Sequence, residues 1–169
     1  MDDFETMPVF GVDAILRDVY AQAMGREEGE VADYIPELAK ADPAPFGIAV
    51  ATARGRLHEI GDTRIPFTIQ SVSKALTYCM ALELVGRAEV LRRVGVEPSG
   101  DPFNAIEFDP VTRRPYNPMV NAGAITVAGI LRDVHGDGAF DAVIARFSEA
   151  AGRPLAMNEA VYRSEAATG

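Results

Sequence analysis

The alternation of apolar and polar residues predicts a helix, a β-hairpin and then a series of further helices. Apolar residues recur at helical spacing in residues 12–24 (VDAILRDVYAQAM), and the acidic, glycine-containing stretch GREEGE ends this segment. Apolar runs at 46–51 and 57–60 flank the turn ARGR, a pattern that is typical of a hairpin. A hairpin combined with separate helices indicates an α+β fold.

The next apolar segment predicts a helix over residues 71–86. Apolar positions surround most of this helix, so we expect it to be buried on several sides. These positions are Val72, Ala75, Leu76, Cys79, Met80, Ala81, Leu82, Leu84 and Val85. A shorter helix over residues 88–95 (AEVLRRVG) follows.

The second half of the chain begins with an irregular segment. Residues 96–118 hold five prolines, and long segments of this kind in a compact domain are usually functional or held by their neighbours. Helical spacing returns at 119–134 and at 139–152. Residues 157–169 (MNEAVYRSEAATG) predict the start of another helix.

Composition narrows the classes of partner and cofactor. A chain of 169 residues that is 48% apolar fits one domain, covering residues 1–169. Its net charge of −9 repels phosphate backbones, so we expect no nucleic-acid partner. The two histidines lie far apart in the sequence and give no metal-ligand spacing, so we expect neither a metal ion nor another cofactor.

The same features predict a cytoplasmic protein. The single cysteine, Cys79, cannot form an internal disulfide, which suits a reducing compartment. The N-terminus (MDDFETMPVFG) is acidic and lacks the basic and apolar regions of a signal peptide. No apolar run approaches the ~20 residues of a membrane span, so we expect no membrane partner.

The stretch PFTIQSVSK carries candidate catalytic chemistry. Ser71 and Lys74 lie three residues apart, which places them on the same face of a helix. A serine hydroxyl needs a base to take its proton, and a lysine amine is a base when burial and the positive end of a helix dipole lower its pKa. This Ser-x-x-Lys arrangement is that of the serine β-lactamases and penicillin-binding proteins.

A purely structural interpretation of this stretch stays open at this point. Ser71 or Ser73 can cap the helix while Lys74 is solvated, and Ser-x-x-Lys occurs often by chance. Between the serines, spacing favours Ser71, because adjacent side chains on a helix diverge. Tyr78 follows seven residues after Ser71 on the same stripe, and we expect it to serve packing.

Six segments in order resemble the serine-dependent glutaminase family, which has a β-lactamase-like fold. They are VADYIPELA (31–39), FGIAVAT (46–52), GDTRIPFTIQSVSKAL (61–76), VGVEPSGDPFN (94–104), NPMVNAGAI (117–125) and RSE (163–165). The resemblance implies hydrolysis of L-glutamine to L-glutamate and ammonia. Ser71 matches the family's nucleophile, which forms a glutamyl ester, and Lys74 matches its base.

The resemblance also implies roles for other side chains. Tyr34 matches a tyrosine of the catalytic site that lines the substrate pocket. Gln70 and Asn121 match substrate contacts, as Ser71 does, and an amide both donates and accepts hydrogen bonds. Glu165 matches a glutamate that faces the α-ammonium group of the substrate, a charge-assisted contact. Without the resemblance, Tyr34 suggests packing, Gln70 a loop amide and Glu165 a solvated acid.

The family's catalytic domain is considerably longer than this chain. We therefore expect a fragment or truncated product that holds the N-terminal part of the domain, and an incomplete serine β-lactamase-like fold without its later strands. Such a fold leaves an open sheet edge and exposed apolar surface, so we expect an unstable, oligomeric or complemented chain. The family resemblance implies a homodimer or homotetramer.

Two other functions remain possible from the sequence. An inactive chain that serves only as an interaction or structural piece is compatible with the length and the acidic composition. A penicillin-recognising hydrolase shares the Ser-x-x-Lys arrangement. The segments DYIPEL and NAGAI and the absence of a signal sequence favour glutamine over penicillin as substrate.

Overall fold

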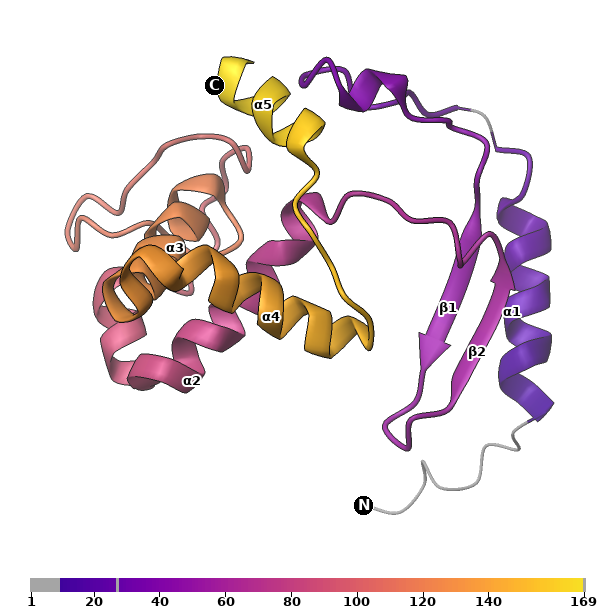
Figure 1. The fold of residues 1–169 in the computed structure, drawn as a ribbon, viewed down its shortest axis with the longest axis horizontal. Helices are drawn as coiled ribbons and strands as arrows, with labels where there is room; N and C mark the ends of the chain where they lie inside the picture. Colours follow the sequence, from indigo (N-terminus) through magenta and orange to yellow (C-terminus); the bar gives the residue numbers. More distant parts are fainter. Residues whose placement is uncertain (1–9, 27, 169) are drawn as a thin grey trace. The chain divides into compact units, whose positions relative to one another are not determined.

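The computed structural model describes residues 10–26 and 28–168. Its internal contacts divide the chain into two units (Figure 1): unit 1 comprises Met1–Phe67 and Asn158–Gly169, and unit 2 comprises Thr68–Met157. The expectation of one domain over residues 1–169 stays a prediction. The expectation that the N-terminus is not a signal peptide concerns residues 1–9, which lie outside the described residues.

Unit 1 contains the predicted first helix and hairpin. Helix α1 (Phe10–Ala23) lies against strand β2 (Leu57–Gly61), which pairs antiparallel with β1 (Gly47–Ala51) (Figure 1). The hairpin turn closes where the Thr52 backbone N–H donates to the Arg56 carbonyl at 2.8 Å. The 3-10 turn η1 (Leu38–Lys40) and helix α5 (Glu159–Thr168) complete the unit. The predicted helix over residues 12–24 and the predicted hairpin are both confirmed.

Three contacts hold α1 on the hairpin. The buried His58 ring lies 2.6 Å from the Asp13 carboxylate, measured from Nδ1 to Oδ1. The rings of Tyr20 and Phe46 stack with their centroids 5.0 Å apart. The Tyr20 ring also lies close to Gly61, where a Cβ would be 2.5 Å from the Tyr20 Cε2. Because Gly61 also has a φ of +75°, this approach requires glycine.

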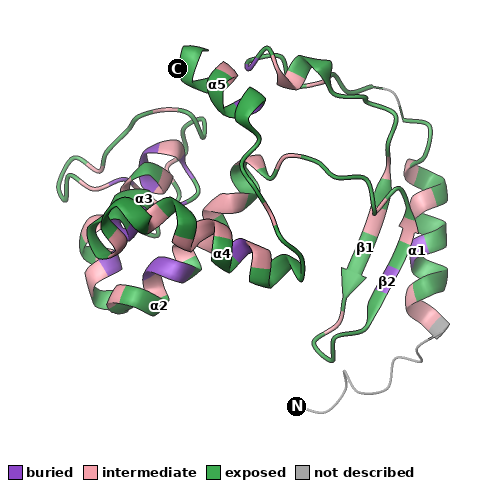
Figure 2. Cartoon of the chain, viewed as in Figure 1, coloured by how far each residue is buried: buried purple, intermediate pink, exposed green. Residues whose placement is uncertain are grey.

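Apolar surface is exposed on the hairpin, as the sequence predicted. Figure 2 shows mostly exposed residues along both strands, and Val50 and Leu57 are among them. The sheet has two strands within the described part of the chain, so neither strand has a second neighbour in it. Unpaired strand edges and exposed apolar side chains favour association with other chains.

Unit 2 is helical. The 3-10 turn η2 (Gln70–Val72) leads into α2 (Ser73–Arg93), and α3 (Asn121–His135) packs beside α2. The 3-10 turn η3 (Gly136–Gly138) then joins α3 to α4 (Ala139–Ala151). The predicted helices over 119–134 and 139–152 are confirmed.

A kink divides α2 at the position where two helices were predicted. Gly86 has φ 79° and ψ 159°, which is far from helical geometry and which side chains with a Cβ rarely adopt. Before the kink, α2 corresponds to the predicted helix over 71–86, although its α-helical geometry begins at Ser73. After the kink, it corresponds to the predicted helix over 88–95.

The core of unit 2 lies between the helices α2, α3 and α4. Its buried members are Met80, Ala81, Val90, Val94, Val127, Ile130, Leu131 and Phe147. Tyr78 is partly buried against this core, which confirms the expectation that it serves packing.

The expectation that residues 71–86 are buried on several sides is wrong. Val72 is 64% exposed, and Ala75, Cys79 and Leu84 are also exposed. The buried residues Met80 and Ala81 belong to the part of the helix that joins the core of unit 2. Apolar and small residues therefore occupy most faces of this helix, but neighbouring residues cover only part of its surface (Figure 2).

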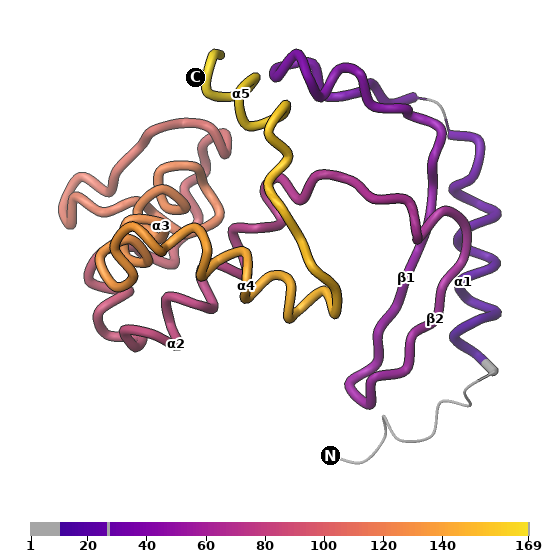
Figure 3. The backbone as a smooth tube through the Cα atoms, in the orientation of Figure 1, coloured from indigo at the N-terminus to yellow at the C-terminus, as the bar shows by residue number. Residues whose placement is uncertain are grey.

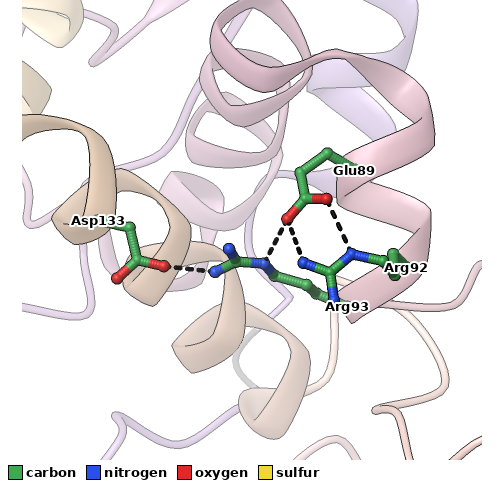
Figure 4. Close-up of polar contacts among 4 residues, drawn as sticks. All are labelled: Glu89, Arg92, Arg93 and Asp133. Carbon is green, nitrogen blue, oxygen red and sulfur yellow. Dashed lines mark hydrogen bonds and ion pairs between the residues drawn. The ribbon is translucent and has the colours of Figure 1, made fainter.

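Beyond the kink, ion pairs connect α2 to α3. Figure 4 shows Glu89 bonded to Arg92 and Arg93, and Arg93 bonded also to Asp133. The two guanidinium groups hold the pKa of Glu89 down at about 2. Arg93 bridges the helices, because Asp133 belongs to α3.

The segment between α2 and α3 is irregular, as predicted, and Figure 3 follows its backbone. Its two ends are held together, since the backbone N–H groups of Gly95 and Glu97 donate to the carbonyls of Pro115 and Tyr116. A turn bond from Ala105 N–H to the Pro102 carbonyl, 2.9 Å long, shapes the middle of the segment.

Candidate active site

The candidate nucleophile lies on a turn that precedes α2. Ser71 is exposed and belongs to η2. Gln70, directly before it, has a φ of 44°, which is uncommon for a residue with a side chain. Strained backbone of this kind costs about 1–3 kcal/mol and clusters at functional sites.

The two serines of the stretch have different environments. The Ser73 hydroxyl donates to the Gln70 carbonyl at 2.7 Å, so it is part of the turn. For the Ser71 hydroxyl, no hydrogen-bond partner is found within residues 10–26 and 28–168. The Ser73 hydroxyl therefore stabilises the turn, whereas the Ser71 hydroxyl has no such bond in this part of the chain.

Lys74 lies in the first turn of α2 and reaches the beginning of α3. Its Nζ donates to the Asn121 side-chain oxygen at 2.7 Å and to the Met119 carbonyl at 3.0 Å. The Phe103 ring lies on another side, with its centroid 5.6 Å from Nζ, within the range of a cation–π contact. These groups come from three separate segments of unit 2.

The environment of Lys74 has opposing effects on its proton affinity. Partial burial lowers the pKa of the amine below its ordinary value of 10.5, because desolvation disfavours the charged form. The two oxygen acceptors and the aromatic face favour the ammonium form. The net direction is downward, as expected for a lysine that acts as a base.

Asn121 is fixed at the first residue of α3. Its backbone N–H donates to the Phe103 carbonyl at 2.8 Å, while its side-chain oxygen accepts from Lys74. An ammonium group is only a donor, so the Asn121 oxygen faces Lys74 and its NH₂ group is left to donate elsewhere. An amide donor in this position, next to the Lys74 amine, can bind an oxygen of a substrate.

The turn before α3 sets the position of Asn121. The Asn117 side-chain oxygen accepts from the backbone N–H groups of Met119 and Val120, at 3.0 and 3.2 Å, so Asn117 shapes this turn. Gly123 lets α3 approach this turn closely. A Cβ on Gly123 would lie 1.9 Å from the Asn117 carbonyl oxygen.

Tyr34 and Glu165 lie in unit 1, and both are exposed. They lie on two segments that a hydrogen bond connects: the Glu37 backbone N–H donates to the Ser164 hydroxyl at 3.2 Å. Tyr34 lies three residues before Glu37, and Glu165 directly follows Ser164. The two predicted substrate contacts of unit 1 are thus on connected segments.

Sequence reasoning missed two groups that contact Lys74. The Met119 carbonyl carries no sequence signal, because any residue has a backbone oxygen. Phe103 belongs to the segment VGVEPSGDPFN, which resembles the glutaminases, but nothing in its spacing points to Lys74.

The described residues were also searched for cavities, metal sites and membrane-spanning helices. A surface cavity of about 340 Å³ is lined by residues that include Leu76, Cys79, Arg146 and Phe147, and by none of the predicted site residues. Within residues 10–26 and 28–168, no group of three or more His, Cys, Asp or Glu side chains could hold a metal ion. No helix in this part of the chain combines the length and apolarity of a membrane span.

Comparisons with known proteins agree on one family. A family model for glutaminases matches residues 29–169. Glutaminase 2 of Bradyrhizobium diazoefficiens is 52% identical over 154 residues, which cover 91% of this chain and 24% of that protein. A crystal structure of Mglu in its glutamate form matches with a TM-score of 0.83 and 42% identity, over 92% of this chain and 36% of that one.

A third relative was solved with a small molecule. It is a probable glutaminase from Bacillus subtilis complexed with 6-diazo-5-oxo-L-norleucine, with a TM-score of 0.68, 31% identity, and coverage of 92% of this chain and 44% of that one. The chain belongs to the glutaminase family. Its solved relatives have the serine β-lactamase-like fold, which confirms the predicted fold class, with two strands in the described residues. The chain spans less than half the length of each of these three relatives.

Proposed function

We propose that this chain takes part in the hydrolysis of L-glutamine to L-glutamate and ammonia, with Ser71 as nucleophile and Lys74 as base. Membership of the glutaminase family supports the reaction. The observation that carries the residue assignment is the turn at the start of α2. There the Ser73 hydroxyl is bonded within the turn, Ser71 is exposed, and burial lowers the pKa of Lys74.

The chemistry follows from these groups. The Ser71 hydroxyl attacks the side-chain amide carbon of glutamine and transfers its proton to Lys74. The tetrahedral intermediate collapses when the nitrogen takes that proton and leaves as ammonia. Water then attacks the glutamyl ester, loses its proton to Lys74, and Ser71 recovers its hydrogen as glutamate leaves.

This mechanism requires Lys74 to move from its present partners. Its amine is bonded to Asn121 and Met119, and catalytic hydrogen bonds are often formed only when substrate is bound. In the proposed complex, the neutral amine gives up one of these acceptors, and its Nζ accepts a hydrogen bond from the Ser71 hydroxyl. Burial lowers the pKa of Lys74, which favours the neutral form that can accept a proton.

The oxyanion and the substrate need further donors and acceptors. The Ser71 backbone N–H lies near the positive end of α2, where it can stabilise a developing oxyanion. Gln70 and Asn121 offer amide groups to the substrate. The resemblance to the glutaminases assigns Tyr34 to the substrate pocket and Glu165 to the α-ammonium group of glutamine.

We further assign the chain to the cytoplasm and to a homodimer or homotetramer. The single cysteine, Cys79, is exposed and needs a reducing compartment to stay free. The exposed apolar side chains of the hairpin, such as Val50 and Leu57, support self-association. Light scattering coupled to size exclusion tests the assembly, and a monodisperse monomer contradicts it.

The test of the function is ammonia release from L-glutamine by the wild type, Ser71→Ala and Ser73→Ala. We expect Ser71→Ala to lose activity by more than about a thousandfold, because the covalent step is lost. Ser73→Ala is the matched control and should keep most activity, since its hydroxyl serves only the turn. Full activity in Ser71→Ala contradicts the assignment.

The same assay separates the other two functions. If the wild type releases no ammonia, the proposal fails and a role as an interaction or structural piece replaces it. Turnover of a chromogenic β-lactam without turnover of glutamine identifies a penicillin-recognising hydrolase instead.

A further inference from the structure

Phe103 makes two contacts with the Lys74–Asn121 pair. Its carbonyl oxygen accepts the Asn121 backbone N–H at 2.8 Å. Its ring centroid lies 5.6 Å from the Lys74 Nζ. Because Lys74 also donates to the Asn121 side chain at 2.7 Å, the three residues form a closed set of pairwise contacts.

Each contact fixes a different degree of freedom. The backbone bond ties the irregular segment that carries Phe103 to the first residue of α3. The bond between Lys74 and Asn121 ties α2 to α3. The ring then limits where the flexible lysine side chain can go, because an ammonium group is attracted to the aromatic face.

The ring also affects the proton affinity of Lys74. It displaces water from one side of the amine, which disfavours the charged form, while its negative face favours that form. The Asn121 and Met119 oxygens also contact the amine, at 2.7 and 3.0 Å. The aromatic character of residue 103 is therefore separable from its bulk: leucine keeps an apolar side chain but lacks the negative face.

We propose that Phe103 is a positioning residue, whose aromatic face holds the Lys74 amine beside Asn121 and favours its ammonium form. The proposal rests on the proposed function for the statement that Lys74 is the base. The contacts of Phe103 with Lys74 and Asn121 do not depend on catalysis, so they can be tested on the chain whether or not glutamine is hydrolysed.

The sequence makes a direct test available, because Lys40 and Lys74 are its two lysines. Carbon-13 labelling of lysine gives two side-chain signals, and Lys40→Arg assigns them. Lys40 is exposed and pairs with Glu37, so it serves as the internal reference. Following both signals by NMR between neutral and strongly basic pH yields the pKa of Lys74 in each variant.

We expect Phe103→Leu to lower the pKa of Lys74 by roughly 0.5, because the cation–π contact is lost while an apolar side chain remains. Phe103→Tyr keeps the aromatic face and should leave this pKa unchanged. Phe108→Leu is the matched control: Phe108 is an exposed phenylalanine of the same irregular segment, and its backbone bridges to Pro115. It should leave the Lys74 signal unchanged.

Two results overturn the proposal. One is an unchanged or raised pKa of Lys74 in Phe103→Leu, and the other is an equal decrease in Phe108→Leu. If glutamine hydrolysis is observed, the acidic limb of its pH dependence, where the base Lys74 becomes protonated, should move to lower pH in Phe103→Leu and return in Phe103→Tyr. If Ser71→Ala stays active but the NMR results hold, the proposed function fails and the positioning role stands.

Discussion

The close approach of α3 to the preceding turn predicts opposite effects for two glycine substitutions in one helix. A Cβ on Gly123 would lie 1.9 Å from the Asn117 carbonyl oxygen and 3.0 Å from the Pro118 Cα. Real Cβ contacts stay above 3.0 Å, so this backbone must recede by about 1 Å or more. At Gly129, in the same helix, a Cβ meets nothing within 4 Å.

The two magnitudes follow from these surroundings. Gly129→Ala should raise the free energy of unfolding by about 0.8–1 kcal/mol, since alanine is the better helix former. Gly123→Ala gains the same propensity but incurs overpacking against backbone, which costs about 1–3 kcal/mol or more. We expect the Gly123 variant to be the less stable of the two by about 1–3 kcal/mol.

Urea unfolding followed by circular dichroism measures both variants against the wild type. The shift of the α3 start also moves Asn121, so the carbon-13 signal of Lys74 should change in Gly123→Ala and not in Gly129→Ala. Equal stability of the two variants would refute the reasoning, because it would mean that the turn and α3 are not in close contact.

Three further predictions concern strain and charge. Gln70→Gly should raise the free energy of unfolding by about 1 kcal/mol, because glycine tolerates a φ of 44°. The same variant should hydrolyse glutamine more slowly. A lower free energy of unfolding in urea would argue against strain at this position. The pKa of Lys74 in the folded chain is below its ordinary value of 10.5, so the unfolded chain binds more protons between these two values. The free energy of unfolding of the wild type, relative to that of Lys74→Met, should therefore rise as pH increases through the folded pKa towards 10.5. Urea titrations in which this relative stability falls over the same pH range would contradict the prediction. Arg92 and Arg93 lower the pKa of Glu89 to about 2, so the stability that Glu89 contributes is present above pH 4.5 and is lost as pH falls towards 2. Glu89→Gln should therefore have a lower free energy of unfolding than the wild type at about pH 6, and the difference between the two should narrow in acid. A difference that stays constant with pH would mean that the ion pairs contribute nothing.

The sequence predicted the elements well because each has a strong local pattern. Helical spacing located α1, α3 and α4, and two apolar runs around a glycine-containing turn located the hairpin. The start of α2 was displaced by two residues, because the positive φ of Gln70 and the bond from Ser73 to its carbonyl form a 3-10 turn there. Local pattern does not report such a turn.

Burial and long-range contacts were harder to predict. An all-round apolar helix suggested burial on several sides, but the described neighbours of α2 cover only part of it. In the site, helical spacing distinguished Ser71 from Ser73, and the structure adds that the Ser73 hydroxyl is bonded to the turn. The contact of Lys74 with Asn121 joins positions 47 residues apart. That contact depends on how α2 and α3 pack, which no spacing in the sequence encodes.

The most direct measurement of the central claim is covalent labelling of the nucleophile. An electrophilic glutamine analogue with a diazo ketone in place of the side-chain amide forms an ether bond to an activated hydroxyl and releases dinitrogen. Peptide mass mapping then identifies the labelled residue in the wild type, Ser73→Ala and Ser71→Ala. We expect one label at Ser71 in the first two proteins and none in the third. A label at another residue, or labelling that persists in Ser71→Ala, would contradict the assignment of Ser71 as nucleophile.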